Sequence, residues 1–148
     1  MKGSKLFTAS WILLLILTIA LAFFSLASAW VAFSGQNDQL ASSTTLEHLR
    51  AVSEEAVTAT RGRRVTAATW ALAYAILSAW IVLGPYRRGE RWAWWALLVS
   101  LGLSQIISLA RIPLIGTSLG AVPSATLLAV LALGLLAGAP RIFSRSAP

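Results

Sequence analysis

A row of small polar side chains with an arginine at its end is the chain's best candidate for binding chemistry. Its members recur every three or four residues, with an amide beside them: Ser100, Ser104, Gln105, Ser108 and Arg111. This spacing places the row on one face of a helix. In one interpretation, these groups form hydrogen bonds between helices packed in a membrane. In the other, the arginine binds an anionic headgroup or substrate at the end of the row.

A second candidate is the basic and aromatic segment 85–95, PYRRGERWAWW, which we call the basic hairpin. Gly89 permits a tight reversal, and indole rings prefer the headgroup region because one edge is polar and the body is apolar. We expect a helix hairpin held at the membrane surface, with a binding site for an anionic lipid or acidic partner as the alternative. The residues that would contact headgroups are Arg87, Arg88, Arg91, Trp92, Trp94 and Trp95.

The basic hairpin resembles the Y-R-R-G-E-R-W-A-W-W type of hairpin in small four-helix bacterial membrane proteins. The likeness covers residues 85–95, or the whole chain if the layout of hydrophobic segments is counted. It implies a four-helix fold in a bacterial membrane. That group has no established activity, so the resemblance implies no catalytic residue.

Other residue types exclude several classes of chemistry. The chain has no cysteine, which excludes thiolate nucleophiles, zinc ribbons and iron–sulfur clusters. Its one histidine, His48, cannot form a metal site alone. The five carboxylates all lie outside the apolar runs: Asp38, Glu47, Glu54, Glu55 and Glu90. Proton-coupled carriers, by contrast, normally place an ionisable group at membrane depth. We therefore expect no enzyme activity, no cofactor and no metal.

Long apolar segments must position these candidates. Hydrophobic residues make up 57% of the 148 residues and charged residues 11%, against roughly 45–50% and about 25% in soluble domains. A spanning helix needs about 20 apolar residues, and a helix satisfies its own backbone polar groups in lipid. We predict a single all-α membrane domain over residues 1–148, with four transmembrane helices in an antiparallel bundle. The spans are expected at about 11–33, 66–83, 92–110 and 122–138.

The connections between these spans differ in character. Residues 34–64 form a polar loop in which Thr44 and Glu47 predict a capping box and 45–60 a short amphipathic helix. Gly62 either bends this helix into the second span or lies within one long helix. Gly84-Pro85 is expected to end the second span, and residues 112–121 to form a tight or partly re-entrant connection.

Small residues at four-residue spacing predict two packing faces, because they let helix backbones approach closely. These faces would pack within the chain or across an oligomer. The second span contributes Ala67, Ala71, Ala75 and Ala79, and the fourth contributes Ala121, Ala125 and Ala129.

The first span has a competing interpretation as a signal peptide. Lys2 and Lys5 precede the apolar run, and residues 27–29 match an A-x-A cleavage site. The apolar run continues through residues 30–33, where a mature N-terminus would turn polar. We therefore expect an uncleaved first helix.

The formal net charge of +7 would suggest nucleic acid as a partner in a soluble protein. Here the basic residues flank apolar segments, so we expect them to set orientation and to contact anionic headgroups, with no nucleic-acid binding. With the N-terminus inside, five basic residues lie outside: Arg50, Arg61, Arg63, Arg64 and Arg111. Seven lie inside: Lys2, Lys5, Arg87, Arg88, Arg91, Arg141 and Arg145. This favours the bacterial inner membrane with both termini cytoplasmic.

The sequence favours a non-enzymatic role. We expect a small structural, accessory or scaffolding membrane protein that acts by helix packing, with itself or within a larger complex. The alternative is a binder or transporter of a small molecule or lipid, using the polar row on the third helix. A binder needs a cavity along this row, whereas an accessory subunit buries the same serines against neighbouring helices.

Overall fold

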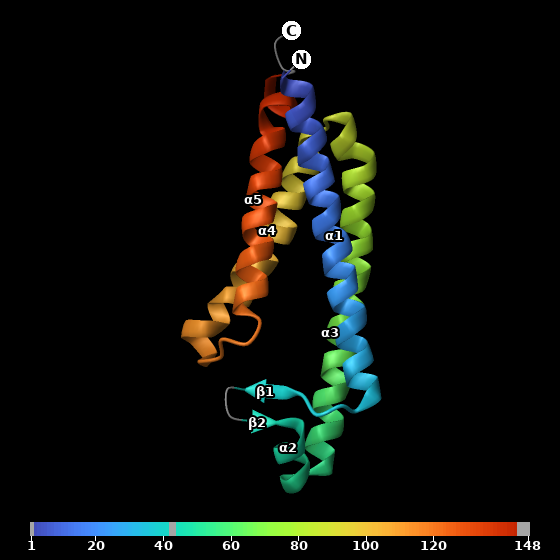
Figure 1. Ribbon diagram of the computed structural model, residues 1–148, viewed down its shortest axis with the longest axis vertical. Helices are drawn as coiled ribbons and strands as arrows, with labels where there is room; N and C mark the ends of the chain where they lie inside the picture. Colours follow the sequence, from blue (N-terminus) through green and yellow to red (C-terminus); the bar gives the residue numbers. More distant parts are fainter. Residues whose placement is uncertain (1, 42–43, 145–148) are drawn as a thin grey trace.

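The computed structural model describes residues 2–41 and 44–144, and these are mostly helical (Figure 1). Two short strands, β1 (Gln39–Ala41) and β2 (Thr44–Thr45), pair antiparallel. The helical elements are α1 (Lys2–Ser34), α2 (Leu46–Val52), α3 (Glu54–Ile81), the π-helical turn η1 (Val82–Tyr86), α4 (Arg91–Ile115) and α5 (Ala121–Ser144). Of these, α1, α3 continued by η1, α4 and α5 are long and apolar enough to cross a membrane. The predicted helical class and the four apolar helices are therefore confirmed.

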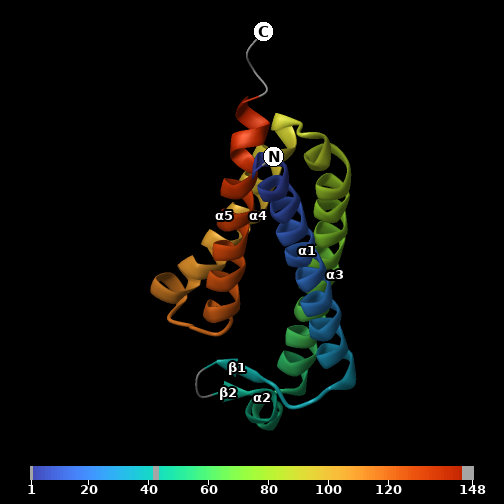
Figure 2. The ribbon, with the colours of Figure 1, turned by 45° about the horizontal axis from the view of Figure 1, so that its top comes forward.

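The long helices form two pairs that meet at one end only. Helix α1 packs against α3 and α5, and α5 packs against α4, whereas α3 and α4 scarcely touch. The α1/α3 pair and the α4/α5 pair meet near the start of α1 and the end of α5, which we call the closed end (Figures 1 and 2). They diverge toward the open end, where β1, β2 and α2 lie. This open arrangement leaves the predicted antiparallel four-helix bundle unconfirmed.

Close packing concentrates at the closed end. Gly134 and Gly138 let α5 approach α1: a Cβ at Gly134 would lie 2.8 Å from Leu14 Cδ2, and one at Gly138 2.6 Å from Ser10 Oγ. The largest apolar cluster is contributed by α1, η1, α4 and α5 and consists of Phe7, Leu14, Leu17, Val82, Tyr86, Ala93, Leu97, Leu101, Leu131, Leu135 and Ile142.

The predicted alanine faces do not form this contact. In α3 only Ala75 is buried, while Ala67 and Ala71 are exposed. In α5 both Ala125 and Ala129 are exposed. Ala79 and Ala121 are half-buried, so neither row forms a continuous packing face within the chain. On α5, glycines and leucines of another face make the contact, and packing across an oligomer stays a prediction.

An arginine pair on α3 holds the far end of α1. Arg61 Nε donates to the Ala32 carbonyl at 2.7 Å, and Arg61 Nη2 donates to the Phe33 carbonyl at 2.9 Å. Carbonyls in the last turn of a helix have no intrahelical donor, so this guanidinium satisfies them. Arg64 forms an ion pair with Asp38. The α1/α3 pair is thus secured at the open end without help from α4 or α5.

Several predicted boundaries require correction. The span expected over 11–33 begins at Lys2, and the span expected over 92–110 continues through Pro113 to Ile115. The span expected over 122–138 continues through Pro140 to Ser144. A proline removes one backbone donor, and near a helix end this loss does not stop the helix.

The tight turns fall at glycines with positive φ. Gly116 (φ 77°) ends α4, and Gly120 (φ 78°) precedes α5. Such a left-handed glycine is a common helix terminator. The connection is therefore 116–120, shorter than the predicted 112–121 and without a re-entrant segment. Gly84-Pro85 does not end the second span, which continues through η1 to the turn at Gly89 (φ 81°).

The polar segment 34–64 differs most from expectation. Thr45, not Thr44, caps α2 by accepting from the His48 amide at 3.4 Å, and the Glu47 carboxylate accepts instead from Asn37 at 3.1 Å. Ser53 ends α2 and caps α3, so the helix predicted over 45–60 is two helices. Helix α3 then runs through Gly62 into the second span, as the long-helix alternative predicts. The β1–β2 pairing was not predicted.

Arg145 and the side chain of Lys2 lie outside what the structure describes.

Candidate functional site

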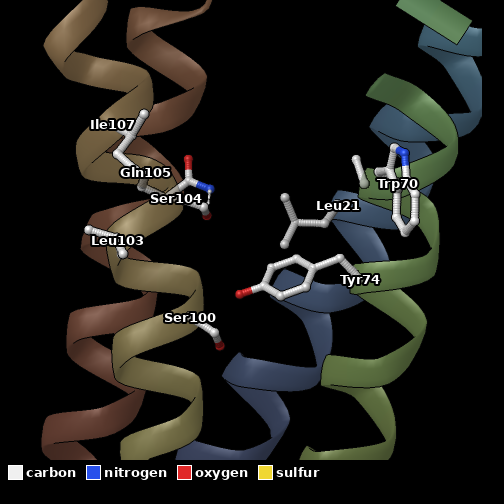
Figure 3. A pocket seen from close by; sticks show the side chains of 9 residues that line it. Leu21, Trp70, Tyr74, Ser100, Leu103, Ser104, Gln105 and Ile107 are labelled. Atoms are coloured by element: carbon white, nitrogen blue, oxygen red, sulfur yellow. Dashed lines mark hydrogen bonds between the residues drawn. The ribbon is translucent and has the colours of Figure 1, made fainter. Parts of the chain in front are cut away.

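An open cavity of about 620 Å³ lies between the helix pairs where they diverge (Figure 3). This volume is typical of small-molecule sites, which usually occupy about 300–1,000 Å³. Apolar side chains dominate its walls, with a few hydroxyls and an amide among them. The lining comes from α1, α3 and α4: Leu21, Trp70, Ala71, Tyr74, Ser100, Leu103, Ser104, Gln105 and Ile107.

A second cavity, of about 390 Å³, adjoins the first on the side of the open end. The two share Leu21, Ala71 and Gln105, and the second extends to Arg111 near the end of α4. It also takes in Ser124 of α5. We call the two cavities together the inter-pair groove. It has an apolar body and a cationic end.

The polar row divides between this groove and the α4–α5 contact. The Ser100 hydroxyl donates to the Ala96 carbonyl, and the Ser104 hydroxyl donates to the Leu101 carbonyl at 2.9 Å. Both acceptors belong to α4, so neither hydroxyl donates a hydrogen bond to another helix. Both residues line the groove. Gln105 Nε2 donates to Ser104 Oγ at 3.3 Å.

Ser108 has the opposite role. Its hydroxyl lies 2.8 Å from that of Ser124, which joins α4 to α5. The sequence offered helix packing and ligand binding as alternatives for the whole row. The structure places Ser108 in the packing contact and Ser100, Ser104 and Gln105 on the groove wall.

Arg111 is half-buried at the cationic end of the groove. Its Nε donates to the Ser108 carbonyl at 3.1 Å, and its Nη2 donates to Ser108 Oγ at 3.3 Å and to the Leu119 carbonyl at 3.1 Å. Gly120 makes room for it, since a Cβ there would lie 3.3 Å from Nη2. All three acceptors are uncharged. Among the described residues, the ion pairs involve Arg50, Arg64 and Arg88, and none involves Arg111.

Tyr74 contributes a polar group that the sequence analysis did not single out. Figure 3 shows its hydroxyl directed across the cavity toward Ser100 of α4. This oxygen is buried and interacts with the Ser100 side chain, but the two form no hydrogen bond of good geometry. Buried tyrosine hydroxyls usually have a partner, so a tyrosine within an apolar span was the available signal.

The basic hairpin lies at the closed end, away from the groove. Each of three arginines there stacks on an aromatic ring of α1 or α5: Arg87 on Trp11 at 4.4 Å, Arg91 on Phe143 at 5.7 Å, and Arg141 on Phe7 at 4.4 Å. The side chains of Arg87, Arg88, Arg91, Trp92 and Trp95 are exposed. They remain accessible to headgroups.

The other side chains of the hairpin bind within the protein. Trp94 is directed inward and donates from Nε1 to the Leu135 carbonyl at 2.9 Å. Glu90 binds Arg88 at 2.9 Å and accepts from Trp92 Nε1 at 2.6 Å, as expected for a carboxylate that neutralises a neighbouring arginine.

A buried hydroxyl pair, also missed from the sequence, joins three elements at the closed end. Ser10 donates to the Gly134 carbonyl at 2.6 Å, and its Oγ lies 2.6 Å from the Tyr86 hydroxyl. Because the Ser10 proton is directed at Gly134, Tyr86 is the donor to Ser10. Phe7 stacks on the Tyr86 ring with centroids 5.8 Å apart. The pair connects α1, η1 and α5 and has no access to the groove.

Within residues 2–41 and 44–144, no cluster of three or more His, Cys, Asp or Glu could hold a metal ion. His48 is exposed on α2. Comparisons of the chain with protein-family models, curated proteins and solved structures found no match.

Proposed function

We propose that the protein is a non-enzymatic integral membrane protein that binds a lipid-like amphipathic molecule between its two helix pairs. The observation that carries this proposal is the inter-pair groove, whose apolar cavity of about 620 Å³ adjoins one that ends at Arg111. A molecule with an apolar chain and a polar end matches both features.

The hydrogen bonds of the polar row favour a binder over a purely structural subunit. Polar groups that hold helices together bond to a neighbouring helix, as Ser108 does with Ser124. Ser100 and Ser104 donate to carbonyls of their own helix and face the cavity. Tyr74 brings to the same space a buried hydroxyl that interacts with Ser100 but forms no hydrogen bond of good geometry. Because an unsatisfied buried polar group costs free energy, a ligand group that bonds to it would gain affinity.

The distribution of charge supports the bacterial inner membrane as the location. Arg87, Arg88, Arg91 and Arg141 lie at the closed end with Lys5, which favours a cytoplasmic position for that end. The four long helices then span the membrane with alternating direction, and the inter-pair groove opens toward the outer leaflet. The resemblance of the basic hairpin to that of small four-helix bacterial membrane proteins agrees with this location.

Assembly with a second copy or within a larger complex is the second candidate function. It is favoured by the exposure of Ala125 and Ala129 on α5, a face of small residues that packs on nothing within the described chain. Native mass spectrometry after mild detergent extraction would detect such an assembly as a stable complex larger than one chain. A monomer at all protein concentrations would contradict this candidate.

Filling the groove tests the proposed binding function. Ser104→Trp places an indole on the groove wall, and we expect it to abolish retention of a lipid-sized mass adduct in native mass spectrometry. Val99→Trp is the matched control, because Val99 is exposed on the same helix and does not line the groove. Equal adduct retention in both variants and the unmodified protein would contradict the proposal.

A further inference from the structure

We infer that the ligand of the inter-pair groove is an anionic lipid, with its phosphate bound by Arg111 and one acyl chain in the cavity. This inference rests on the proposed binding function and specifies the headgroup charge and the lipid's position. Among the described residues that line the groove, Arg111 alone is charged.

The hydrogen bonds of Arg111 leave it ready for an anion. A guanidinium has five N–H donors, and the three bonds that Arg111 makes use its Nε and Nη2 groups. No bond from Nη1 is formed within the described chain, and the existing acceptors are neutral. The contacts to Ser108 and Leu119 also hold the side chain in place. A fixed guanidinium without a carboxylate favours an oxyanion, because its positive charge is uncompensated and the two N–H donors of Nη1 can form charge-assisted hydrogen bonds.

The length of the groove matches one membrane leaflet. Eleven residues separate Ser100 from Arg111 on α4, a rise of about 16 Å at 1.5 Å per residue. This is about half of the roughly 30 Å hydrocarbon core. Arg111 lies about one turn from the end of α4 at Ile115, and the end of a spanning helix is expected near the headgroups. The groove therefore runs from the level of a headgroup to the level where its acyl chain ends.

The walls agree with this placement. Between Arg111 and the far end of the groove at Ser100 and Tyr74, the lining includes Leu103, Ile107 and Trp70, which offer apolar surface to a chain (Figure 3). The arginines of the basic hairpin differ from Arg111, because Arg87 and Arg91 are exposed and stack on aromatic rings.

The test uses the full-length protein in nanodiscs that contain equal amounts of phosphatidylglycerol and phosphatidylcholine, followed by native mass spectrometry. We expect about tenfold preferential retention of phosphatidylglycerol, which corresponds to about 1.4 kcal/mol. Arg111→Gln should bring this preference close to one. Arg63→Gln removes the same charge from an exposed position of α3 outside the groove and should leave the preference unchanged. Arg111→Lys keeps a positive charge and should retain most of it.

Two further arms distinguish the source of the anion. Excess inorganic phosphate should not displace phosphatidylglycerol, and a long-chain fatty acid should displace it only partly. Displacement by phosphate alone would overturn the inference, as would equal retention of the two lipids or an unchanged preference in Arg111→Gln. Lipid retained without headgroup preference, and lost in Ser104→Trp, would overturn the inference while leaving the proposed function intact. No lipid retention in the unmodified protein would overturn both.

Discussion

The closed end and the open end are built from the same two helix pairs, which pack against each other at the closed end and diverge at the open end. At the closed end, Gly134 and Gly138 allow α1 to approach α5 closely, and the Ser10 hydroxyl forms hydrogen bonds with α5 and with η1. At the open end, bulky side chains such as Trp70 and Leu103 line the space between α3 and α4. Among the described residues, Tyr74 of α3 interacts with Ser100 of α4 without forming a hydrogen bond of good geometry.

This difference shows which interactions join helices in an apolar solvent. Lipid tails are as apolar as leucine, so apolar surface alone provides little drive for two helices to associate. Close approach of backbones at small residues and hydrogen bonds between helices provide the rest. Where α3 and α4 lack close approach, the space between them stays open, and the proposed lipid would occupy it.

Gly138→Leu should have the largest effect, because it removes the close approach at the closed end. Its side chain would collide with Tyr86 and Ser10, and overpacking of this kind costs about 1–3 kcal/mol. Thermal unfolding in detergent, followed by near-ultraviolet circular dichroism, should show a lower midpoint. Ala129→Leu, on an exposed part of α5, serves as the control and should change the midpoint little. An equal shift in both variants would refute the special role of the closed end.

Ser10→Ala should have an intermediate effect. It leaves the Tyr86 hydroxyl and the Gly134 carbonyl without the partner they share. The loss should be about 1 kcal/mol, since interhelical hydrogen bonds in membranes average about 0.6 kcal/mol and a buried unsatisfied group adds a penalty. The same unfolding measurement applies, with Thr126→Val as control because its hydroxyl bonds only to Val122 of its own helix. A midpoint unchanged from that of the unmodified protein would show that the hydroxyl pair contributes nothing to joining the helices.

Ala71→Leu, an enlargement at the open end, should have the smallest effect on stability. Ala71 is exposed and lines both cavities of the inter-pair groove, so the added side chain enters open space. We expect a change in the free energy of unfolding of less than about 0.5 kcal/mol, together with reduced lipid retention. Destabilisation as large as that of Gly138→Leu would mean that the two ends are packed alike.

The sequence predicted the four apolar helices well, because each needs an uninterrupted charge-free run. It placed their ends less well, because Pro85 and Pro113 were expected to interrupt or stop helices and do not. A proline near a helix end removes only one donor, and neighbouring residues decide whether the helix continues.

The site was partly predictable. The spacing of Ser100, Ser104 and Gln105 placed them on one side of α4, but spacing cannot show whether that side meets a helix or a cavity. This depends on where the pairs diverge, which is determined by the fit of Gly134 and Gly138 against α1. The exposed alanines of α5 show the same limit of spacing, since their regular interval does not identify the face that α5 buries.

The π-helical turn η1 determines the rotational phase of the chain that follows it. The Arg87 amide bonds back five residues to the Val82 carbonyl, and the Glu90 amide to the Pro85 carbonyl. Such a turn accommodates one residue more than an α-helix would at this place. Deleting Gly84 would remove this extra residue and permit a regular α-helix, with Tyr86 still near its present direction. Deleting one residue from the regular part of α3 would also shorten the span by only about 1.5 Å, but it would rotate the following residues by about 100°. Tyr86 would then no longer face Ser10. A deletion that hardly alters hydrophobic length would thus disconnect the two helix pairs.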